Sequence, residues 1–134
     1  MGTVLFPFFD RDIPGETVVD AYNGRALAKA AYDENSALNA ACTHLGIRKI
    51  EEFYAESNAE AFEKIGEDLP DDLDADEGLT WFEPGVAAEV ISKILESREA
   101  VEFDSDLTQD LYDLKAAMDF GVSNNCRFRL RISF

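Results

Sequence analysis

The last nine residues of the chain, 126–134, alternate between apolar and polar side chains without a break. Because neighbouring side chains of a β-strand point to opposite faces, this alternation predicts a strand with one buried side. Five apolar side chains, from Cys126 to Phe134, share that side. The opposite side carries three arginines: Arg127, Arg129 and Arg131. The strand therefore needs a layer of other elements to cover its apolar face.

The remaining sequence supplies a second strand and several helices. Residues 3–9 are mostly β-branched or aromatic, which predicts a strand. Apolar residues at helical spacing predict helices, which we place at 25–44 with a break near 33–35, at 47–53, at 58–67, from 84 to about 95, and at 106–120. We expect Asn58 to cap the helix at 58–67, with Ala61, Phe62 and Ile65 facing inward, and Gly121 to end the last helix.

These elements predict an α+β fold in one globular domain, residues 1–134. A small sheet containing the N- and C-terminal strands packs its apolar face against about four or five helices. We expect the following residues to be buried together: Ile91, Leu95, Leu111, Leu114, Met118, Phe128, Leu130 and Ile132.

The chain is strongly acidic, with 28 acidic and 12 basic residues and a formal net charge of -16. This charge disfavours binding to nucleic acid or to an anionic membrane and is compatible with a basic protein partner. We expect first that the charge keeps the protein soluble or reflects a salty habitat, and second that it matches a basic partner. The N-terminal apolar run has no basic region before it and no cleavage site of small residues, so we expect a cytoplasmic protein. The sequence leaves the oligomeric state open.

Several short motifs together resemble one group of proteins. They are Asn23-Gly24-Arg25-Ala26-Leu27, Leu45-Gly46-Ile47-Arg48, Trp81-Phe82-Glu83-Pro84, Phe120-Gly121-Val122 and the strand from Phe128 to Phe134. In this succession the chain is similar to a group of small uncharacterised bacterial proteins. The resemblance implies a single-domain α+β protein and brings no activity, cofactor or functional residue with it.

The acidic segment 72–83 has the spacing of a calcium-binding loop. Asp72, Asp74 and Asp76 fall at the first, third and fifth positions, and Glu83 falls at the twelfth, where a bidentate ligand belongs. The sixth position needs a residue that can turn sharply, and Glu77 occupies it in place of glycine. We therefore expect a solvated acidic loop, with a degenerate calcium-type site as the alternative.

The arginine side of the last strand allows three interpretations. The first is that Arg127, Arg129 and Arg131 form surface ion pairs with acidic residues of a neighbouring element. The second is that they bind an acidic partner segment or a small anionic ligand. The third, nucleic acid, is disfavoured by the surrounding negative charge. We expect the first.

The sequence shows no catalytic constellation. Cys42 and His44 are two residues apart, so on a helix they point in different directions and cannot bind one metal ion. The pattern therefore predicts a non-enzymatic protein without a cofactor that binds another protein, as an accessory, inhibitory or immunity-type factor. The alternative is a small-molecule or metal-binding domain with a degenerate calcium-type loop at 72–83, and an enzyme, such as a hydrolase that uses Asp or Glu, comes third.

Overall fold

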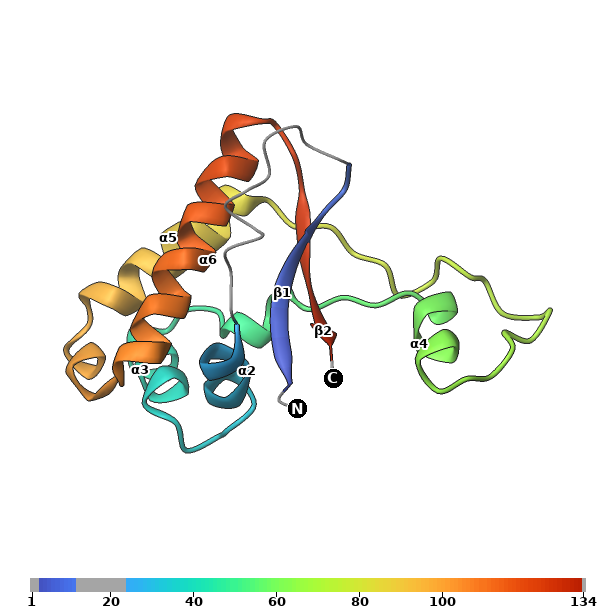
Figure 1. Ribbon diagram of the computed structural model, residues 1–134. Helices are drawn as coiled ribbons and strands as arrows, with labels where there is room; N and C mark the ends of the chain where they lie inside the picture. The colour runs from blue at the N-terminus through green and yellow to red at the C-terminus, as the bar shows by residue number, and fades with distance from the viewer. Residues whose placement is uncertain (1–2, 12–23, 134) are drawn as a thin grey trace.

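The two terminal strands pair with each other. The computed structural model describes residues 3–11 and 24–133, and within them β1 (Val4–Phe9) and β2 (Phe128–Ser133) form an antiparallel sheet (Figure 1). Phe9 lies opposite Phe128, Phe8 opposite Arg129 and Phe6 opposite Arg131. The predicted pairing of the terminal strands is confirmed, while Phe134 lies outside the described residues.

Strand β2 also has neighbours on its other edge. The backbone N–H of Ala55 donates to the carbonyl of Leu130 at 3.3 Å. Phe82 and Phe128 exchange two backbone hydrogen bonds, with N···O distances of 2.7 and 2.9 Å. Strand β2 is therefore the central element of the sheet, with β1 on one side and two short extended segments on the other.

Five α-helices and two short 3₁₀ helices lie within the described residues. They are α2 (Arg25–Ala31), α3 (Ala37–Leu45), η1 (Ile50–Phe53), α4 (Asn58–Lys64), α5 (Pro84–Glu96), η2 (Arg98–Glu102) and α6 (Ser105–Ser123). The architecture confirms the predicted α+β fold and its small sheet. The break expected near 33–35 separates α2 from α3.

Local sequence explains where the helices begin and end. The Ser36 side chain accepts a hydrogen bond from the N–H of Asn39 and caps α3, and Gly46 ends that helix with a φ of 66°. Asp104 caps α6 in the same way as Ser36 caps α3. The expected Asn58 cap of α4 is wrong by one residue, because the Ser57 hydroxyl and Glu60 form a capping box that leaves Asn58 as the first helical residue.

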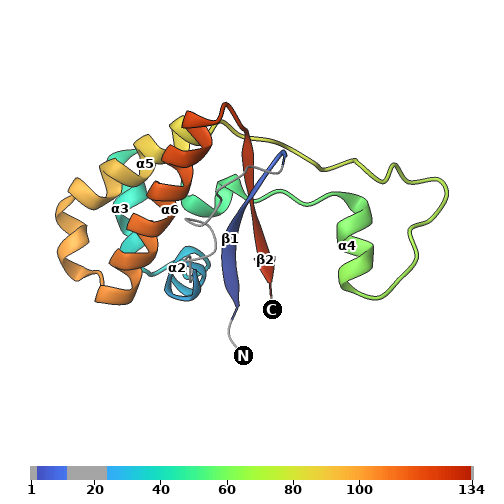
Figure 2. The same ribbon diagram turned by 45° about the horizontal axis from the view of Figure 1, so that its top comes forward.

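The core lies between the apolar side of the sheet and the pair α5 and α6, which run side by side in both ribbon views (Figures 1 and 2). Of the eight residues expected in it, six are fully or almost fully buried, and Leu95 and Ile132 pack against it while partly exposed.

A buried carboxylate also joins two helices, because Asp110 of α6 accepts the N–H of Leu27 in the first turn of α2 at 3.1 Å.

The prediction that Gly121 ends the last helix is wrong. Helix α6 continues to Ser123, and Gly121 lies inside it, where a Cβ atom would come within 2.7 Å of the Phe9 ring and 3.2 Å of Pro84. The glycine thus allows α6 to approach β1 and α5 closely, and its position reflects packing rather than helix termination.

Residues 56–80, which we call the arm, project from this body to one side in both ribbon views (Figures 1 and 2). The arm contains α4 and the acidic loop. No residue of α4 is fully buried, and Ile65, expected to face inward, is 67% exposed. The inward orientation of Ile65 is therefore wrong, because the arm extends beyond the core that was expected to receive it.

No helix in the described part of the chain is long and apolar enough to cross a membrane.

Candidate functional site

The three arginines of β2 lie in different environments. Arg127 is exposed, with 57% of its side chain accessible, and pairs with Asp10 at 3.6 Å. The side chain of Arg129 is only 5% exposed and that of Arg131 is 28% exposed. Each arginine has an ion pair with the chain's own carboxylates, as the first interpretation expected. The expectation that all are surface pairs is wrong for Arg129, because the arm covers it.

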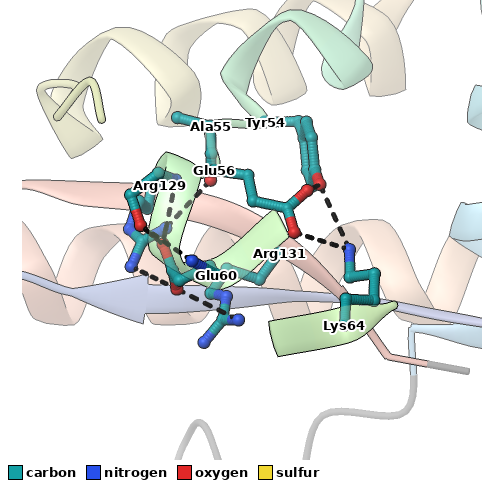
Figure 3. Close-up of polar contacts among 8 residues, drawn as sticks. Tyr54, Ala55, Glu56, Glu60, Lys64, Arg129 and Arg131 are labelled. Carbon is teal, nitrogen blue, oxygen red and sulfur yellow. Dashed lines mark hydrogen bonds and ion pairs between the residues drawn. The ribbon is translucent and has the colours of Figure 1, made fainter. Parts of the chain in front are cut away.

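One carboxylate, that of Glu60 on α4, receives both the buried Arg129 and the half-buried Arg131 (Figure 3). Nη1 and Nη2 of Arg129 donate to its two oxygens at 2.6 and 2.9 Å, a bidentate arrangement that matches the planar shapes of both groups. Arg131 approaches Oε2 at 3.0 Å. Nη1 of Arg129 also donates to the carbonyl of Ala55 at 3.0 Å, which ties the guanidinium to the segment beside β2.

Ser57 completes the shell around the Glu60 carboxylate. Its backbone N–H and its hydroxyl both donate to Oε1, at 3.1 and 3.0 Å. These contacts come from the N-terminal capping box of α4, so the helix itself orients the carboxylate toward β2.

Two aromatic rings frame the Arg129 guanidinium. Phe8 is its cross-strand neighbour, and the ring centroid of Phe8 lies 5.0 Å from the central guanidinium carbon. The Trp81 ring lies 5.1 Å from the same carbon and stacks with Phe8 at 6.2 Å between centroids. Both distances allow cation–π attraction, which is strengthened where water is excluded.

The electrostatics of Glu60 follow from these contacts. Burial alone would raise the pKa of its carboxyl, but the hydrogen bonds from Arg129 and Ser57, with the positive charge of Arg129, outweigh burial and lower the pKa to about 2. Glu60 is therefore ionised at neutral pH, and the contact is a charged pair of carboxylate and guanidinium.

A second polar cluster lies at the root of the arm. Glu56 pairs with Lys64 of α4 at 3.0 Å and accepts a hydrogen bond from the Tyr54 hydroxyl (Figure 3). Burial and the neighbouring carboxylate of Glu56 raise the pKa of Tyr54 to about 12, so its hydroxyl stays a donor at neutral pH. The pKa of Glu56 is lowered, because its hydrogen bonds to Tyr54 and Lys64 outweigh the effect of its own burial.

The residues proposed for a calcium loop are not gathered around a common centre. Residues 71–78 are all exposed, and no group of three or more Asp, Glu, His or Cys side chains in the described ranges is placed to hold a metal ion. The Oδ1 atom of Asp74 instead accepts the N–H of Asp76, and the N–H of Asn58 donates to the carbonyl of Glu77. The loop is tied to α4 by its backbone, and its carboxylates face solvent.

The cysteine and histidine residues lie away from the arm. Cys42 and Cys126 are both free and buried, and burial raises the pKa of the Cys42 thiol to about 11, so it stays protonated at neutral pH. Nδ1 of His44 lies 3.7 Å from Oε1 of Glu99. The protonated thiol of Cys42 is a poor nucleophile. Nε of Arg11 donates a hydrogen bond to Sγ of Cys126 at 3.2 Å.

Comparison with protein-family models, with curated proteins and with solved structures finds no match.

Sequence reasoning missed the partners of Arg129. Glu60 was hidden among many carboxylates, although the pattern Ser57-x-x-Glu60 marked a capping box and fixed the direction of its side chain. Phe8 and Trp81 gave a different signal, since each is a large aromatic residue on the polar side of the sheet, where it needs a neighbour to cover it.

Proposed function

We propose that this chain is a non-enzymatic cytoplasmic protein that binds another protein, as an accessory, inhibitory or immunity-type factor, and that the arm is its contact with a basic partner. The binding of an acidic partner or anion by the exposed part of the arginine side, chiefly Arg127, stays a separate prediction.

The charge and shape of the arm carry this proposal. Ten of the 28 acidic residues lie between 56 and 80, against a single basic residue, Lys64. The arm stands away from the core, and residues 71–78 are exposed throughout (Figure 2). It also exposes two large apolar side chains, Ile65 at 67% and Leu73 at 38%.

Concentrating like charges on a projecting segment destabilises the folded chain by self-repulsion, and a partner of opposite charge relieves that repulsion. Opposite charge also steers the encounter and raises the association rate. Apolar side chains among the carboxylates add contact area that a charged surface alone does not provide. The arm therefore suits a partner surface that combines lysine or arginine with apolar residues.

The experiment places a photo-crosslinking amino acid at Ile65 on the arm and, as a matched control, at Val101 on η2, which is 87% exposed. We expect the arm position, and not the control, to crosslink to a protein of basic isoelectric point in cells. That protein is then purified and its affinity measured at low and high salt.

Two charge-matched variants test whether the arm is the contact. One replaces four arm acids, Asp68, Asp71, Asp72 and Asp76, with asparagine. The other neutralises four exposed acids of the body: Glu34, Glu96, Glu102 and Asp106. The arm variant should bind at least about tenfold more weakly and with a smaller salt dependence, while the body variant should bind much as the wild type does. Equal weakening in both would mean that only net charge matters and would refute the arm as the contact.

A further inference from the structure

The Glu60 carboxylate contacts the arginines of β2 as a bound ligand contacts the residues of its binding site. The receptor half belongs to the body, where Arg129 and Arg131 lie on one strand and the Ala55 carbonyl fixes Arg129. The ligand half, the Glu60 carboxylate, belongs to the arm. With the arm in place Arg129 is 4% exposed and its Nε atom is buried without a hydrogen-bond partner, so the guanidinium depends on the Glu60 carboxylate for its counter-charge.

The arm has few other means of holding its position. Helix α4 has seven residues and none is fully buried, so it gains little from apolar packing. Within the residues that the structure describes, two ion pairs join the arm to the body, and Glu60 makes both of them. The pair between Glu56 and Lys64 is internal to the arm, while Lys64 also donates a hydrogen bond of 3.4 Å to the hydroxyl of Tyr54, just outside the arm.

We infer that Arg129 and Arg131, together with Ser57, form a carboxylate-binding site, that Glu60 is its resident ligand, and that occupation of this site holds the first turn of α4 beside β2, which we call the docked state. When the site is empty, α4 separates from β2 while the core stays folded. This inference concerns the free protein and does not depend on a partner.

The site selects a planar carboxylate. The two parallel N–H groups of Arg129 are spaced to donate to both oxygens of one carboxylate. A spherical anion such as chloride can accept a hydrogen bond of optimal length from only one of them. Replacing Glu60 with alanine removes one methylene group and the carboxylate, which together have nearly the size of acetate. Acetate therefore fits the vacated space with the same donors from Arg129, Arg131 and Ser57.

The test uses Glu60→Ala, with Glu63→Ala as control, since Glu63 lies one turn along α4 and is exposed. Lys64 is the only site in the arm where trypsin can cleave, so the rate of cleavage there reports how often α4 opens. We expect cleavage at Lys64 to be at least about tenfold faster in Glu60→Ala than in Glu63→Ala, because charge-assisted hydrogen bonds have been lost.

Acetate should reverse the effect. About 100 mM acetate should slow the cleavage of Glu60→Ala, whereas sodium chloride of the same ionic strength or neutral acetamide should not. Ser57 completes the site only while α4 is docked, so acetate binds the docked state more tightly and stabilises it. The single tryptophan, Trp81, lies against Arg129, so its fluorescence should change with the same acetate concentration dependence.

Equal cleavage of the two variants, or slowing by chloride as strong as by acetate, would overturn the inference. If Glu60→Ala does not fold, Glu60→Gln takes its place, since glutamine keeps the shape and one acceptor oxygen. Faster cleavage at Lys64 while the core still unfolds in denaturant as one cooperative unit then supports docking by the carboxylate, and absence of a folded core refutes it.

Discussion

Neutralising Glu60 should destabilise the protein by an amount that depends on pH in a defined way. The pKa of this carboxyl falls from an ordinary value of 4.5 to about 2 in the folded chain. Each pKa unit corresponds to about 1.4 kcal/mol, so ionised Glu60 contributes at most about 3 kcal/mol to the free energy of unfolding at neutral pH. Its side chain is 17% exposed, and solvent and salt screen part of the interaction, so we expect the measured loss to lie below this upper bound.

The sign follows from the direction of the shift. Because the folded pKa lies below the unfolded one, the contribution is complete above about pH 4.5 and is lost as pH falls toward 2. At pH 3 the same linkage leaves about 1.4 kcal/mol, less than half of the value at neutral pH. The difference in stability between wild type and Glu60→Gln should therefore shrink between pH 7 and pH 3.

The assay is urea unfolding of wild type and Glu60→Gln at pH 7, 4.5 and 3, with Glu63→Gln measured at pH 7 to control for the loss of one negative charge from the arm. Taking the difference between wild type and variant at each pH cancels the titration of the other carboxylates that they share. A loss below about 0.5 kcal/mol at pH 7, or a difference that stays constant with pH, would refute the account of the Glu60 contacts.

Three further outcomes are expected. Leu130→Ala should cost about 2 to 5 kcal/mol in a denaturant melt, since this side chain is fully buried between sheet and helices, and a loss below about 1 kcal/mol would contradict its place in the core. Gly121→Ala should lower stability by about 1 kcal/mol or more in the same melt, because overpacking against Phe9 outweighs the gain in helix propensity. Gly85→Ala is the control, since its Cβ atom would lie 3.7 Å from its nearest neighbour, and it should be neutral or stabilising. Calorimetric titration with calcium should show no site tighter than about 10 µM in the segment 72–83, and a tighter site lost on substituting its acids would overturn the solvated loop.

The sheet and the core could be predicted because they follow from short-range patterns. Strict alternation over the last strand predicted that Phe128 and Leu130 lie on its buried face. The helical spacing of Leu111, Leu114 and Met118 predicted the face of the last helix that is buried with them. A periodic pattern shows which residues share a face. Only one face of the last strand is apolar, so only that face could pack against the apolar faces of the helices.

The failures arise where packing brings distant segments together. Periodicity placed Ile65 on an apolar face of its helix, but no second layer lies opposite that face, because the arm leaves the body. Glycine at 121 has the composition of a helix end and instead allows close contact with Phe9, a residue more than a hundred positions away. The helix propensity of a residue reflects its own local backbone, and it gives no information about contacts with residues distant in the sequence.

Arg129 shows most clearly why the polar side of a strand cannot be judged from alternation alone. An arginine between two other arginines is expected to reach water, yet the capping box of α4 aims a carboxylate at it while Phe8 and Trp81 remove solvent from its flanks. A buried guanidinium without a counter-charge would cost several kcal/mol, so the arrangement is stable only with Glu60 in place. The same requirement ties the acidic arm to the one concentrated basic feature of the chain, so the arm's position and the burial of Arg129 depend on each other.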